Sequence, residues 1–453
     1  MLRKIAAVLA PAASSAALLI FVLAAPAQAA PQGADDPARA AASQVLVGFV
    51  ADASEQDRAR AASHVSARRR EYVASDVELI YLPSANANSR AIDELRGDPA
   101  VRFSEPNWTV TTAAVSTDPF YTNGSLWGMY GDDLTTPTNP YGSQADEAWA
   151  AGNTGSKDVY VGVIDEGIQF DHSDLSGQVG NPLETLDGID NDKNGYTDDV
   201  QGWDFANNDN SIYDGGRKGN LDKHGTHVTG TIGAKANNGT GVVGVNWNVT
   251  AISGKFLGRN GGTTANAIKA VDYFTGLKAR GLNIVATNNS WGGGGYSQGL
   301  LDAITRGAKA NILFVAAAGN SNTDNDATAS YPSNYNTTDT VDPASYDAVI
   351  AVAAIDKVGA LASFSQYGAK TVDLGAPGVS INSTLPYNKY GAYSGTSMAA
   401  PHVTGAAALY AASPLGAGAS GETIKNAILG TAEPTASLSG KTVTGGRLNA
   451  GGF

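Results

Sequence analysis

Four short runs of uninterrupted apolar residues constrain the fold of this 453-residue chain more than any other feature. They lie at 159–164, 284–286, 312–317 and 348–352. Apolar residues without alternation are typical of parallel strands that are buried on both faces. Helical patterns at Thr264–Arg280 and Gln298–Ala310 fall between these runs. We therefore expect an α/β domain in which helices cover both faces of a mostly parallel sheet.

The first 29 residues have the pattern of an export signal. Two basic residues are followed by an apolar core at 18–23 and by Ala27-Gln28-Ala29, small residues that suit a cleavage site. The alternative is a membrane anchor, but Pro11 and two nearby serines leave the stretch short of the roughly 20 apolar residues that span a bilayer. We expect residues 1–29 to direct secretion and the mature protein to have no membrane anchor.

A small α+β unit is expected at residues 44–113, after a polar linker at 30–43 and before a large domain at 114–453. Its patterns predict a strand at 45–50, a helix at 54–70, a strand at 77–82, a helix at 89–96 and a strand at 101–110. With one further strand after the first helix, this is the ferredoxin-like order. A small unit between an export signal and a large domain is typical of a prosegment.

Charge and cysteine content exclude several classes of function. The chain has no cysteine, which rules out disulfides, a thiol nucleophile and cysteine-ligated zinc. Its 30 Lys and Arg against 43 Asp and Glu give a net charge of −13, which would repel nucleic-acid phosphates. An exported chain without disulfides is stabilised by its core, by bound ions or by both.

Three short segments supply an acid, a base and a nucleophile in the order Asp, His, Ser. Asp165 follows the apolar run at 159–164, where α/β sheets place functional groups. His224 and Ser397 each stand where a helix is expected to begin among small residues. A serine hydroxyl needs a neighbouring base, and a helix N-terminus favours developing negative charge. The alternative for Asp165 and Ser397 is a purely local capping role.

Together these segments resemble the catalytic signatures of the subtilase family. The matching residues are Val163-Ile164-Asp165-Glu166-Gly167, His224-Gly225-Thr226-His227-Val228 and Gly395-Thr396-Ser397-Met398-Ala399-Ala400-Pro401-His402. The likeness runs from about Gln44 to Leu448 and includes the small N-terminal unit. It implies a subtilisin-like three-layer domain after an inhibitor-type prosegment, and serine endopeptidase activity on polypeptides.

The resemblance also implies a role for each catalytic position. Asp165 would orient the imidazole of His224, which would act as base and then as acid for Ser397. Asn320 would donate its side-chain amide to the oxyanion, beside the backbone N–H of Ser397. His227, one turn after His224, would have a structural role.

Residues on two segments are implied to form the pocket for the substrate residue before the scissile bond: Ser290, Trp291, Gly292, Ala318 and Gly319. Their small size indicates a roomy apolar pocket, although Ser330 near its floor leaves the preference open. Two features depart from the family pattern. The glycine run at 292–295 could loosen the wall, and Glu166 replaces a small hydroxyl residue, where a second carboxylate could raise local pKa values.

A calcium loop is predicted within the polar segment Asn181–Gly219, which is too long for an ordinary connection. Oxygen-bearing residues follow the spacing of an EF-hand loop, with flanking acids at either end: Asp187, Asp190, Asp192, Asn194, Asp198 and Asp199. Gln201 stands where an EF-hand has its glutamate, which favours a static loop over a helix–loop–helix sensor. The alternative is a solvated acidic turn.

The family resemblance further implies a second calcium site and a self-processing route. The matching ligand positions are Asp118, Asp174 and Asn238. The prosegment would assist folding and then inhibit the cleft through its C-terminal strand, and cleavage would fall between Val110 and Ser116. We expect a monomer that holds two or more calcium ions and does not bind nucleic acid.

Two rival functions compete with that of a serine protease. His224 and His227 share a helix face and could bind zinc, but no His-Glu-x-x-His motif or convincing third ligand is visible. A catalytically inactive binding protein on the same fold is disfavoured, because all four catalytic positions are intact.

Overall fold

The computed structural model describes residues 40–83, 88–108, 114–132, 137–216 and 221–452. They belong to two compact units that divide after Thr109. The expected export signal and most of the linker lie outside the described residues, as does most of the expected processing segment. Within the described ranges, no helix combines the length and apolarity needed to cross a membrane.

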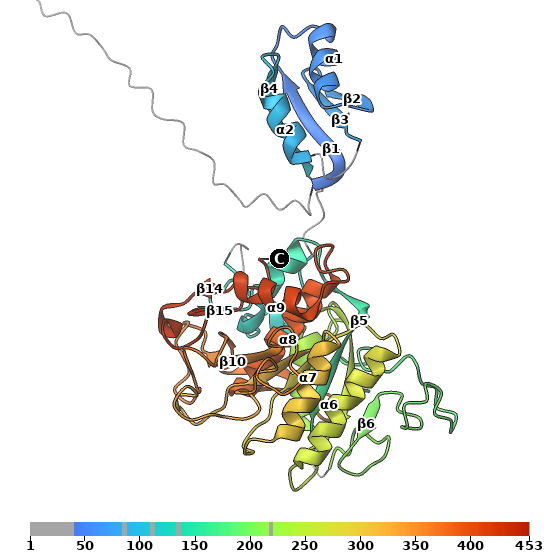
Figure 1. The fold of residues 1–453 in the computed structure, drawn as a ribbon, viewed down its shortest axis with the longest axis vertical. Helices are drawn as coiled ribbons and strands as arrows, with labels where there is room; N and C mark the ends of the chain where they lie inside the picture. Colours follow the sequence, from blue (N-terminus) through green and yellow to red (C-terminus); the bar gives the residue numbers. More distant parts are fainter. Residues whose placement is uncertain (1–39, 84–87, 109–113, 133–136, 217–220, 453) are drawn as a thin grey trace, which may run out of the picture. The chain divides into compact units, whose positions relative to one another are not determined.

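The N-terminal unit is a four-stranded antiparallel sheet with two helices (Figure 1), in the strand order β2-β3-β1-β4. Its elements are β1 (Ala40–Phe49), α1 (Glu55–His64), β2 (Arg69–Ala74), β3 (Val77–Tyr81), α2 (Asn88–Arg96) and β4 (Val101–Trp108). Alternate residues of β1, namely Val45, Val47 and Phe49, are buried in one core with residues of both helices. The predicted ferredoxin-like arrangement is present.

The first helix of this unit is shorter than the sequence predicted. α1 begins after Ser54, whose hydroxyl accepts the N–H of Asp57 at 3.2 Å, and it ends at His64 rather than at Arg70. Ser66 has a φ of 54°, which breaks the helix, and the following arginines pair with β3 as strand β2. Arginine suits either structure, so the composition of this stretch did not distinguish helix from strand.

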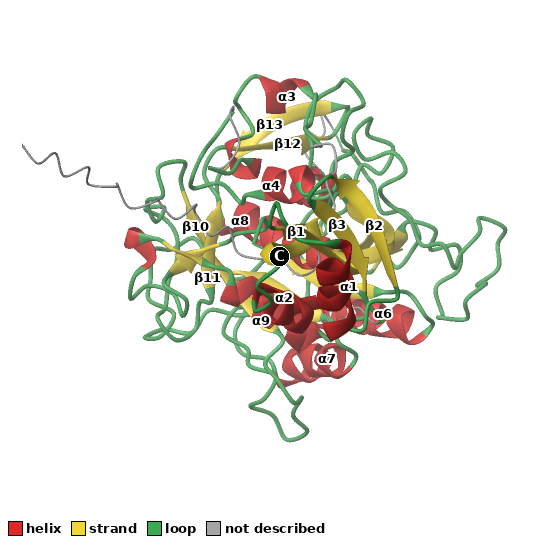
Figure 2. Cartoon of the chain, turned by 90° about the horizontal axis from the view of Figure 1, so that it is seen from above, coloured by secondary structure: helices red, strands yellow, loops and turns green. Residues whose placement is uncertain are grey.

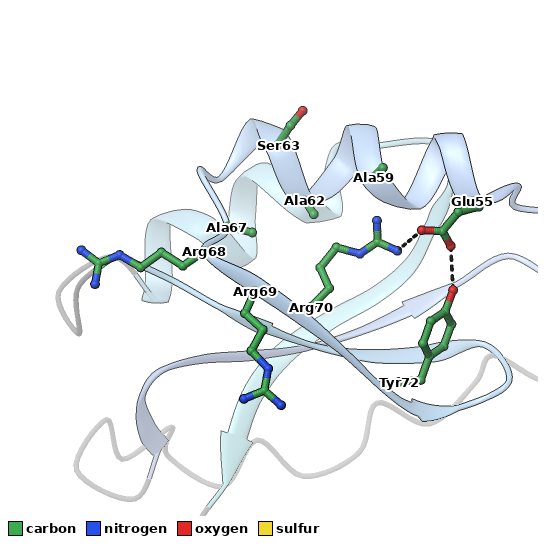
Figure 3. A pocket seen from close by; sticks show the side chains of 9 residues that line it. All are labelled: Glu55, Ala59, Ala62, Ser63, Ala67, Arg68, Arg69, Arg70 and Tyr72. Carbon is green, nitrogen blue, oxygen red and sulfur yellow. Dashed lines mark hydrogen bonds and ion pairs between the residues drawn. The ribbon is translucent and has the colours of Figure 1, made fainter.

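An open surface cavity of about 470 Å³ lies between α1 and β2 (Figure 3). It is lined by Glu55, Ala59, Ala62, Ser63, Ala67, Arg68, Arg69, Arg70 and Tyr72. Glu55 accepts hydrogen bonds from Arg70 and from Tyr72, each at 2.6 Å. Glu55 thus pairs close to water, whereas Arg70 also pairs at 2.8 Å with Glu78, which is fully buried.

The second unit is built on a nine-stranded sheet in which every neighbouring pair is parallel except β14 and β15. Across the sheet the strands are β14 (Glu433–Pro434), β15 (Gly446–Arg447), β11 (Leu374–Pro377), β10 (Val349–Ile355), β9 (Leu313–Ala317), β8 (Ile284–Asn289), β5 (Gly155–Asp165), β7 (Asn248–Lys255) and β6 (Gly202–Asp204). The four apolar runs are four of these strands, as predicted.

Helices cover both faces of the sheet, and successive residues of a strand bury on opposite faces. Val161 and Val163 belong to the core that includes α5 (Lys223–Gly233) and α8 (Thr396–Ala412). Ile164 belongs to the core of α6 (Thr264–Ala279) and α7 (Gln298–Lys309), which lie side by side (Figure 1). The predicted three-layer α/β architecture is confirmed.

Shorter elements complete the second unit. They are α3 (Pro119–Thr122), η3 (Trp127–Met129), α4 (Ala145–Ala150), α9 (Gly421–Gly430), η5 (Ala436–Leu438) and the separate hairpin of β12 (Ile381–Leu385) and β13 (Lys389–Tyr393), visible in Figure 2. The described part of the long polar segment, residues 181–216, is mostly irregular, although it contributes the edge strand β6.

Candidate active site

The strand order of the sheet reverses direction at β5. β6 and β7 lie on one side of β5, and β8 and the later strands lie on the other. Such a switch point leaves a crevice beyond the strand ends, where α/β proteins place their reactive groups. Asp165 is the last residue of β5 and only 1% exposed.

The imidazole of His224 faces this buried carboxylate from the first turn of α5. Its Nδ1 lies 2.9 Å and 3.0 Å from the two carboxylate oxygens of Asp165. Burial alone would lower the pKa of His224, but the charge and hydrogen bond of Asp165 outweigh it, so this pKa is raised. The carboxylate therefore favours an Nδ1–H tautomer and leaves Nε2 as the basic nitrogen.

Ser397 is the second residue of α8 and is partly exposed. Its hydroxyl donates to the backbone oxygen of Ser290 at 3.1 Å, and the Ser290 hydroxyl donates to the backbone oxygen of Ser397 at 2.8 Å. The reciprocal pair fixes the start of α8 against the end of β8. The Ser397 hydroxyl is thus directed at Ser290 rather than at His224; catalytic hydrogen bonds often align only when substrate is bound.

Asn320 follows β9 and is oriented by Thr396. Its Oδ1 accepts hydrogen bonds from the N–H of Thr396 at 2.9 Å and from the Thr396 hydroxyl at 3.0 Å. The amide nitrogen of Asn320 and the backbone nitrogen of Ser397 each lie 3.6 Å from the position that a Cβ on Gly395 would take. Both donors therefore border one small space, which glycine at 395 leaves open.

The five residues predicted to line the substrate pocket follow two adjacent parallel strands, β8 and β9, so the fold brings them to one edge of the sheet. The indole of Trp291 packs against Phe256, with ring centroids 4.9 Å apart, in the core under α6 and α7. The backbone of Trp291, rather than its side chain, is therefore available to line the predicted substrate pocket. Gly294 pairs with Tyr331, which ties the glycine run at 292–295 to the neighbouring loop.

His227 and His402 are fully buried, and each lies within hydrogen-bond distance of a backbone oxygen. His227 Nε2 lies 2.9 Å from the backbone oxygen of Ile381, and its ring stacks on Tyr393. Burial lowers the pKa of His227 to about 3 and that of His402 to about 4. In the described residues, the only close group of three metal-binding side chains is acidic and contains no histidine. Nothing therefore supports the zinc alternative.

In the predicted calcium loop, some acidic side chains lie close together, and others bond to the backbone instead. Carboxylate oxygens of Glu184, Asp190 and Asp192 lie within 4.8 Å of one another. Asp198 instead accepts the N–H groups of Asp187 and Gly188, at 3.0 Å and 2.9 Å. The sequence analysis missed Glu184, which precedes the EF-hand spacing and enters the cluster only through the loop's path.

The same loop contains buried carboxylate oxygens that accept no hydrogen bond from the described residues. Glu184 Oε2 and Asp199 Oδ1 are buried and have no hydrogen-bond partner among the described residues. The other Asp199 oxygen accepts from Tyr273 at 2.5 Å and from Asn194 at 3.0 Å. Burial raises the pKa of Glu184, Asp192 and Asp199. Neighbouring carboxylates add to the shift at Glu184 and Asp192, and Arg280, 3.7 Å from Asp192, opposes it there.

The second expected ligand set is also assembled. Asn238 donates its N–H to Asp118 at 3.2 Å and its side-chain amide to Asp174 at 2.8 Å. Both carboxylates are fully buried. Each of their oxygens already accepts a hydrogen bond, from donors that include Asn237, Thr240 and Val242.

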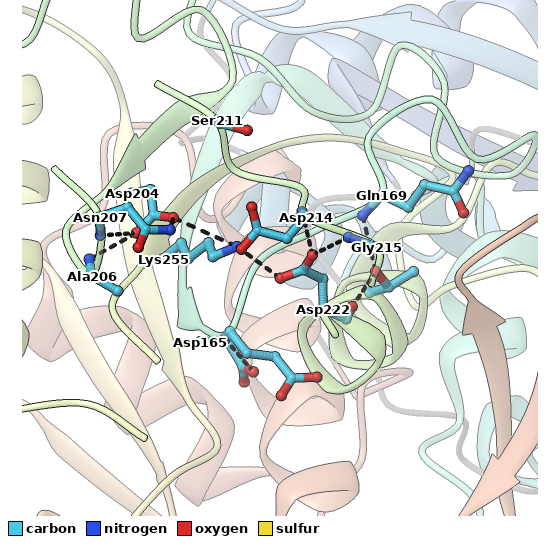
Figure 4. Close-up of polar contacts among 12 residues, drawn as sticks. Asp165, Gln169, Asp204, Ala206, Asn207, Ser211, Asp214, Gly215, Asp222 and Lys255 are labelled. Atoms are coloured by element: carbon cyan, nitrogen blue, oxygen red, sulfur yellow. Dashed lines mark hydrogen bonds and ion pairs between the residues drawn. The ribbon is translucent and has the colours of Figure 1, made fainter. Parts of the chain in front are cut away.

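A charge cluster around the buried Lys255 adjoins Asp165 (Figure 4). Lys255, the last residue of β7, pairs with Asp165 in the sheet register. Its ammonium lies 2.6 Å from Asp214, 3.0 Å from Asp222 and 3.6 Å from Asp204. Lys255 is 1% exposed, and the carboxylates raise its pKa despite its burial. The sequence analysis did not single out this cluster.

Comparisons with known proteins agree for both units. The Subtilase family model matches residues 156–450, and the Fervidolysin N-terminal prodomain model matches residues 26–107. The thermophilic serine proteinase of Bacillus sp. (strain AK1) is 33% identical over 372 residues, which cover 81% of this chain and 77% of that protein. Thermitase of Thermoactinomyces vulgaris is 34% identical over 325 residues, 70% of this chain and 98% of thermitase.

Solved structures give the same result for the fold. A protease from Pseudoalteromonas arctica matches with a TM-score of 0.57 and 26% identity, over 75% of this chain and 98% of that one. The family model, the curated relatives and the fold therefore lead to one conclusion: this chain belongs to the subtilase family of serine proteases and carries an N-terminal prodomain.

Proposed function

We propose that the chain is the precursor of a secreted serine endopeptidase in which Asp165, His224 and Ser397 form the catalytic triad. The observation that carries this proposal is the bond from His224 Nδ1 to the buried Asp165 carboxylate, at 2.9 Å and 3.0 Å. A buried acceptor on Nδ1 fixes the ring and its tautomer, as a serine nucleophile requires.

In the proposed reaction, Ser397 Oγ attacks the carbonyl carbon of the substrate while His224 Nε2 takes the hydroxyl proton. The same nitrogen then gives that proton to the leaving amine as the C–N bond breaks. Water, deprotonated by His224, hydrolyses the resulting ester and restores the Ser397 hydroxyl. Asp165 stays ionised throughout and stabilises the imidazolium that forms in each half of the reaction.

The negative oxygen of the tetrahedral intermediate would sit in the space left open by Gly395. The amide of Asn320 and the backbone N–H of Ser397 border that space. Losing one such donor typically lowers kcat by about 10²–10³-fold. The backbone at 290–292 and the small residues Ala318 and Gly319 would wall the adjoining substrate pocket.

The triad is tested by Asp165→Asn in the mature enzyme. The amide offers Nδ1 a donor group and favours the wrong tautomer, so kcat for a peptide substrate should fall by about 10⁴-fold with KM little changed. Asp158→Asn is the matched control, because Asp158 lies on the same strand but is exposed. Equal activity of the two variants would contradict the assignment.

We also propose that calcium stabilises the enzyme, through the loop at 184–199. Calcium prefers carboxylate and carbonyl oxygens, and this cluster offers Glu184, Asp190 and Asp192 close together with unpartnered buried oxygens nearby. A bound ion would supply positive charge and would be held by these side chains. Both oxygens of Asp190 and of Asp192 also accept protein hydrogen bonds, so the unpartnered oxygens of Glu184 and Asp199 are what favours this loop. The Asp118 and Asp174 set fits less well, because all of its carboxylate oxygens have partners.

Chelation should therefore lower the thermal midpoint of the mature enzyme, since an ion that binds only the folded state stabilises it. Replacing both Asp190 and Asp192 with Asn should remove most of this chelator effect, whereas replacing Asp118 should remove less of it. A chelator effect that survives in the Asp190 and Asp192 double variant would move the proposed site elsewhere. No effect in the wild type would end the calcium proposal.

A further inference from the structure

The helix that carries His224 lacks an N-cap from its own N-cap residue. α5 begins at Lys223, and Asp222 before it has a φ of 61° and makes no side-chain cap bond. An aspartate at this position would ordinarily accept the N–H of the second or third helical residue. The second helical residue here is His224, so its backbone N–H needs another acceptor.

The carboxylate of Asp222 is bound by groups outside α5 (Figure 4). One oxygen pairs with Lys255 at 3.0 Å, and the other accepts the N–H of Gly215 at 2.8 Å and that of Asp214. Asp222 is 1% exposed, so no water competes for these contacts. The buried charge cluster thus prevents Asp222 from capping α5.

Glu166 takes over this role from the end of β5. Its Oε1 accepts the backbone N–H of His224 at 2.5 Å. Its own N–H donates to Asp165 Oδ1 at 2.8 Å. Two consecutive carboxylates therefore hold His224, one at the ring and one at the backbone.

We propose that Glu166 is a positioning residue for catalysis: its carboxylate caps α5 at His224, and its charge favours the protonated imidazole. The proposal rests on the proposed function, because it concerns the base of that reaction. Glu166 does not touch the reacting atoms. It acts by fixing where the imidazole stands and how readily the ring holds a proton.

The charges around Glu166 set the direction of its electrostatic effect. The groups that act on it are Asp165 on β5, Asp222 and His224 at the start of α5, and Tyr393 on β13, while Lys223 acts on His224. Burial and then Asp165 raise the pKa of Glu166, and the His224 N–H opposes this. The Glu166 charge contributes to the raised pKa of His224. Removing that charge should therefore lower the His224 pKa.

Two substitutions separate the cap from the charge. Glu166→Gln keeps an oxygen acceptor and removes the charge, so kcat at its optimum should stay within about 3-fold of wild type. Glu166→Ala removes both, and kcat should fall by roughly 3- to 30-fold through misplacement of His224. In both variants the acid limb of the kcat/KM profile should move to lower pH, because activity needs a neutral imidazole. The exposed Asp158→Asn variant should leave the limb in place.

A second readout does not depend on turnover. In Ser397→Ala protein, the imidazole protons of His224 can be titrated by NMR with and without Glu166→Gln. We expect a lower titration midpoint in the double variant, and faster amide exchange at His224 when Ala replaces Glu166. An unchanged midpoint together with an unmoved acid limb would overturn the role of Glu166. Activity that survives Asp165→Asn would instead overturn the proposed function itself.

Discussion

One salt bridge of the N-terminal unit and one of the catalytic unit show opposite uses of charged side chains. In the first, Arg90 pairs with Glu94 on α2 at 2.7 Å, with the arginine side chain 86% exposed. In the second, Lys255 pairs with Asp222 at 3.0 Å, and the two side chains are 1% and 2% exposed. The distances are similar, but the first pair lies at the surface and the second is buried. Water screens the first pair, whereas the second is desolvated and needs both charges to be present.

This difference links charge to catalysis in one unit only. Asp222 immediately precedes α5, and its carboxylate is fixed by Lys255, so the buried cluster holds the start of the helix that carries His224. The surface pairs of the N-terminal unit have no comparable connection to a reactive group. We therefore expect the loss of Lys255 and the loss of Arg90 to differ strongly in effect.

The comparison is tested most severely by Lys255→Met. The change leaves two buried carboxylates, Asp204 and Asp222, and the more exposed Asp214 without their cation, and removing one partner of a buried pair typically costs about 3–5 kcal/mol. Denaturant unfolding in the Ser397→Ala background, which prevents self-digestion, measures this cost. Lys269→Met is the matched control, because Lys269 is exposed on α6. A cost no larger than that of the control would remove the distinction between the units.

Asp146→Asn tests the effect of burying a carboxylate in the catalytic unit through the pH dependence of stability. Asp146 in α4 is 1% exposed, and burial raises its pKa to about 7, although a hydrogen bond from Tyr121 opposes the shift. The folded state thus binds this proton more tightly than the unfolded state. Its contribution to stability is therefore greatest below pH 3.8, the unfolded value, and is lost as pH rises toward 7.

The asparagine variant cannot titrate, so it should be more stable than the parent at pH 8 by roughly 2–4 kcal/mol and nearly equal to it near pH 4. Chemical unfolding at several pH values in the Ser397→Ala background measures the difference. A constant difference across this pH range would show that Asp146 does not titrate as its burial requires.

Arg90→Ala should have the smallest effect. The Arg90–Glu94 pair is a solvent-exposed i,i+4 pair, worth about 0.3–0.5 kcal/mol at most. The unfolding midpoint of the precursor should hardly move, and the small change should shrink further in high salt. A loss approaching that of Lys255→Met would mean that the N-terminal unit depends on its surface pairs after all.

Local patterns predicted the elements whose signal is contained in a few adjacent residues. The apolar run ending at Ile164 identified β5, and the small-residue segment around Ser397 identified the start of α8. Helix boundaries near arginines were less predictable: α1 stops at His64 because Ser66 adopts a left-handed backbone, which no composition signal reports.

Contacts between distant segments could not be predicted in the same way. Glu184 joins Asp190 and Asp192 only because the loop folds back. Asp198 stands at a ligand position of the EF-hand spacing, but its carboxylate accepts hydrogen bonds from backbone N–H groups instead. The cap from Glu166 depends on Asp222 being held by Lys255, 33 residues further along the chain. The spacing of residues in the sequence identifies candidate ligands and caps, but their positions depend on the folded chain.

The central claim, that Ser397 is the nucleophile of a self-processing precursor, is tested most directly by intact mass and N-terminal analysis. Purified wild-type and Ser397→Ala precursors are refolded side by side, away from other proteases. The account predicts a wild-type product that begins between Val110 and Ser116, and a variant that keeps its prosegment covalently attached. Accurate processing of the refolded Ser397→Ala chain would contradict it.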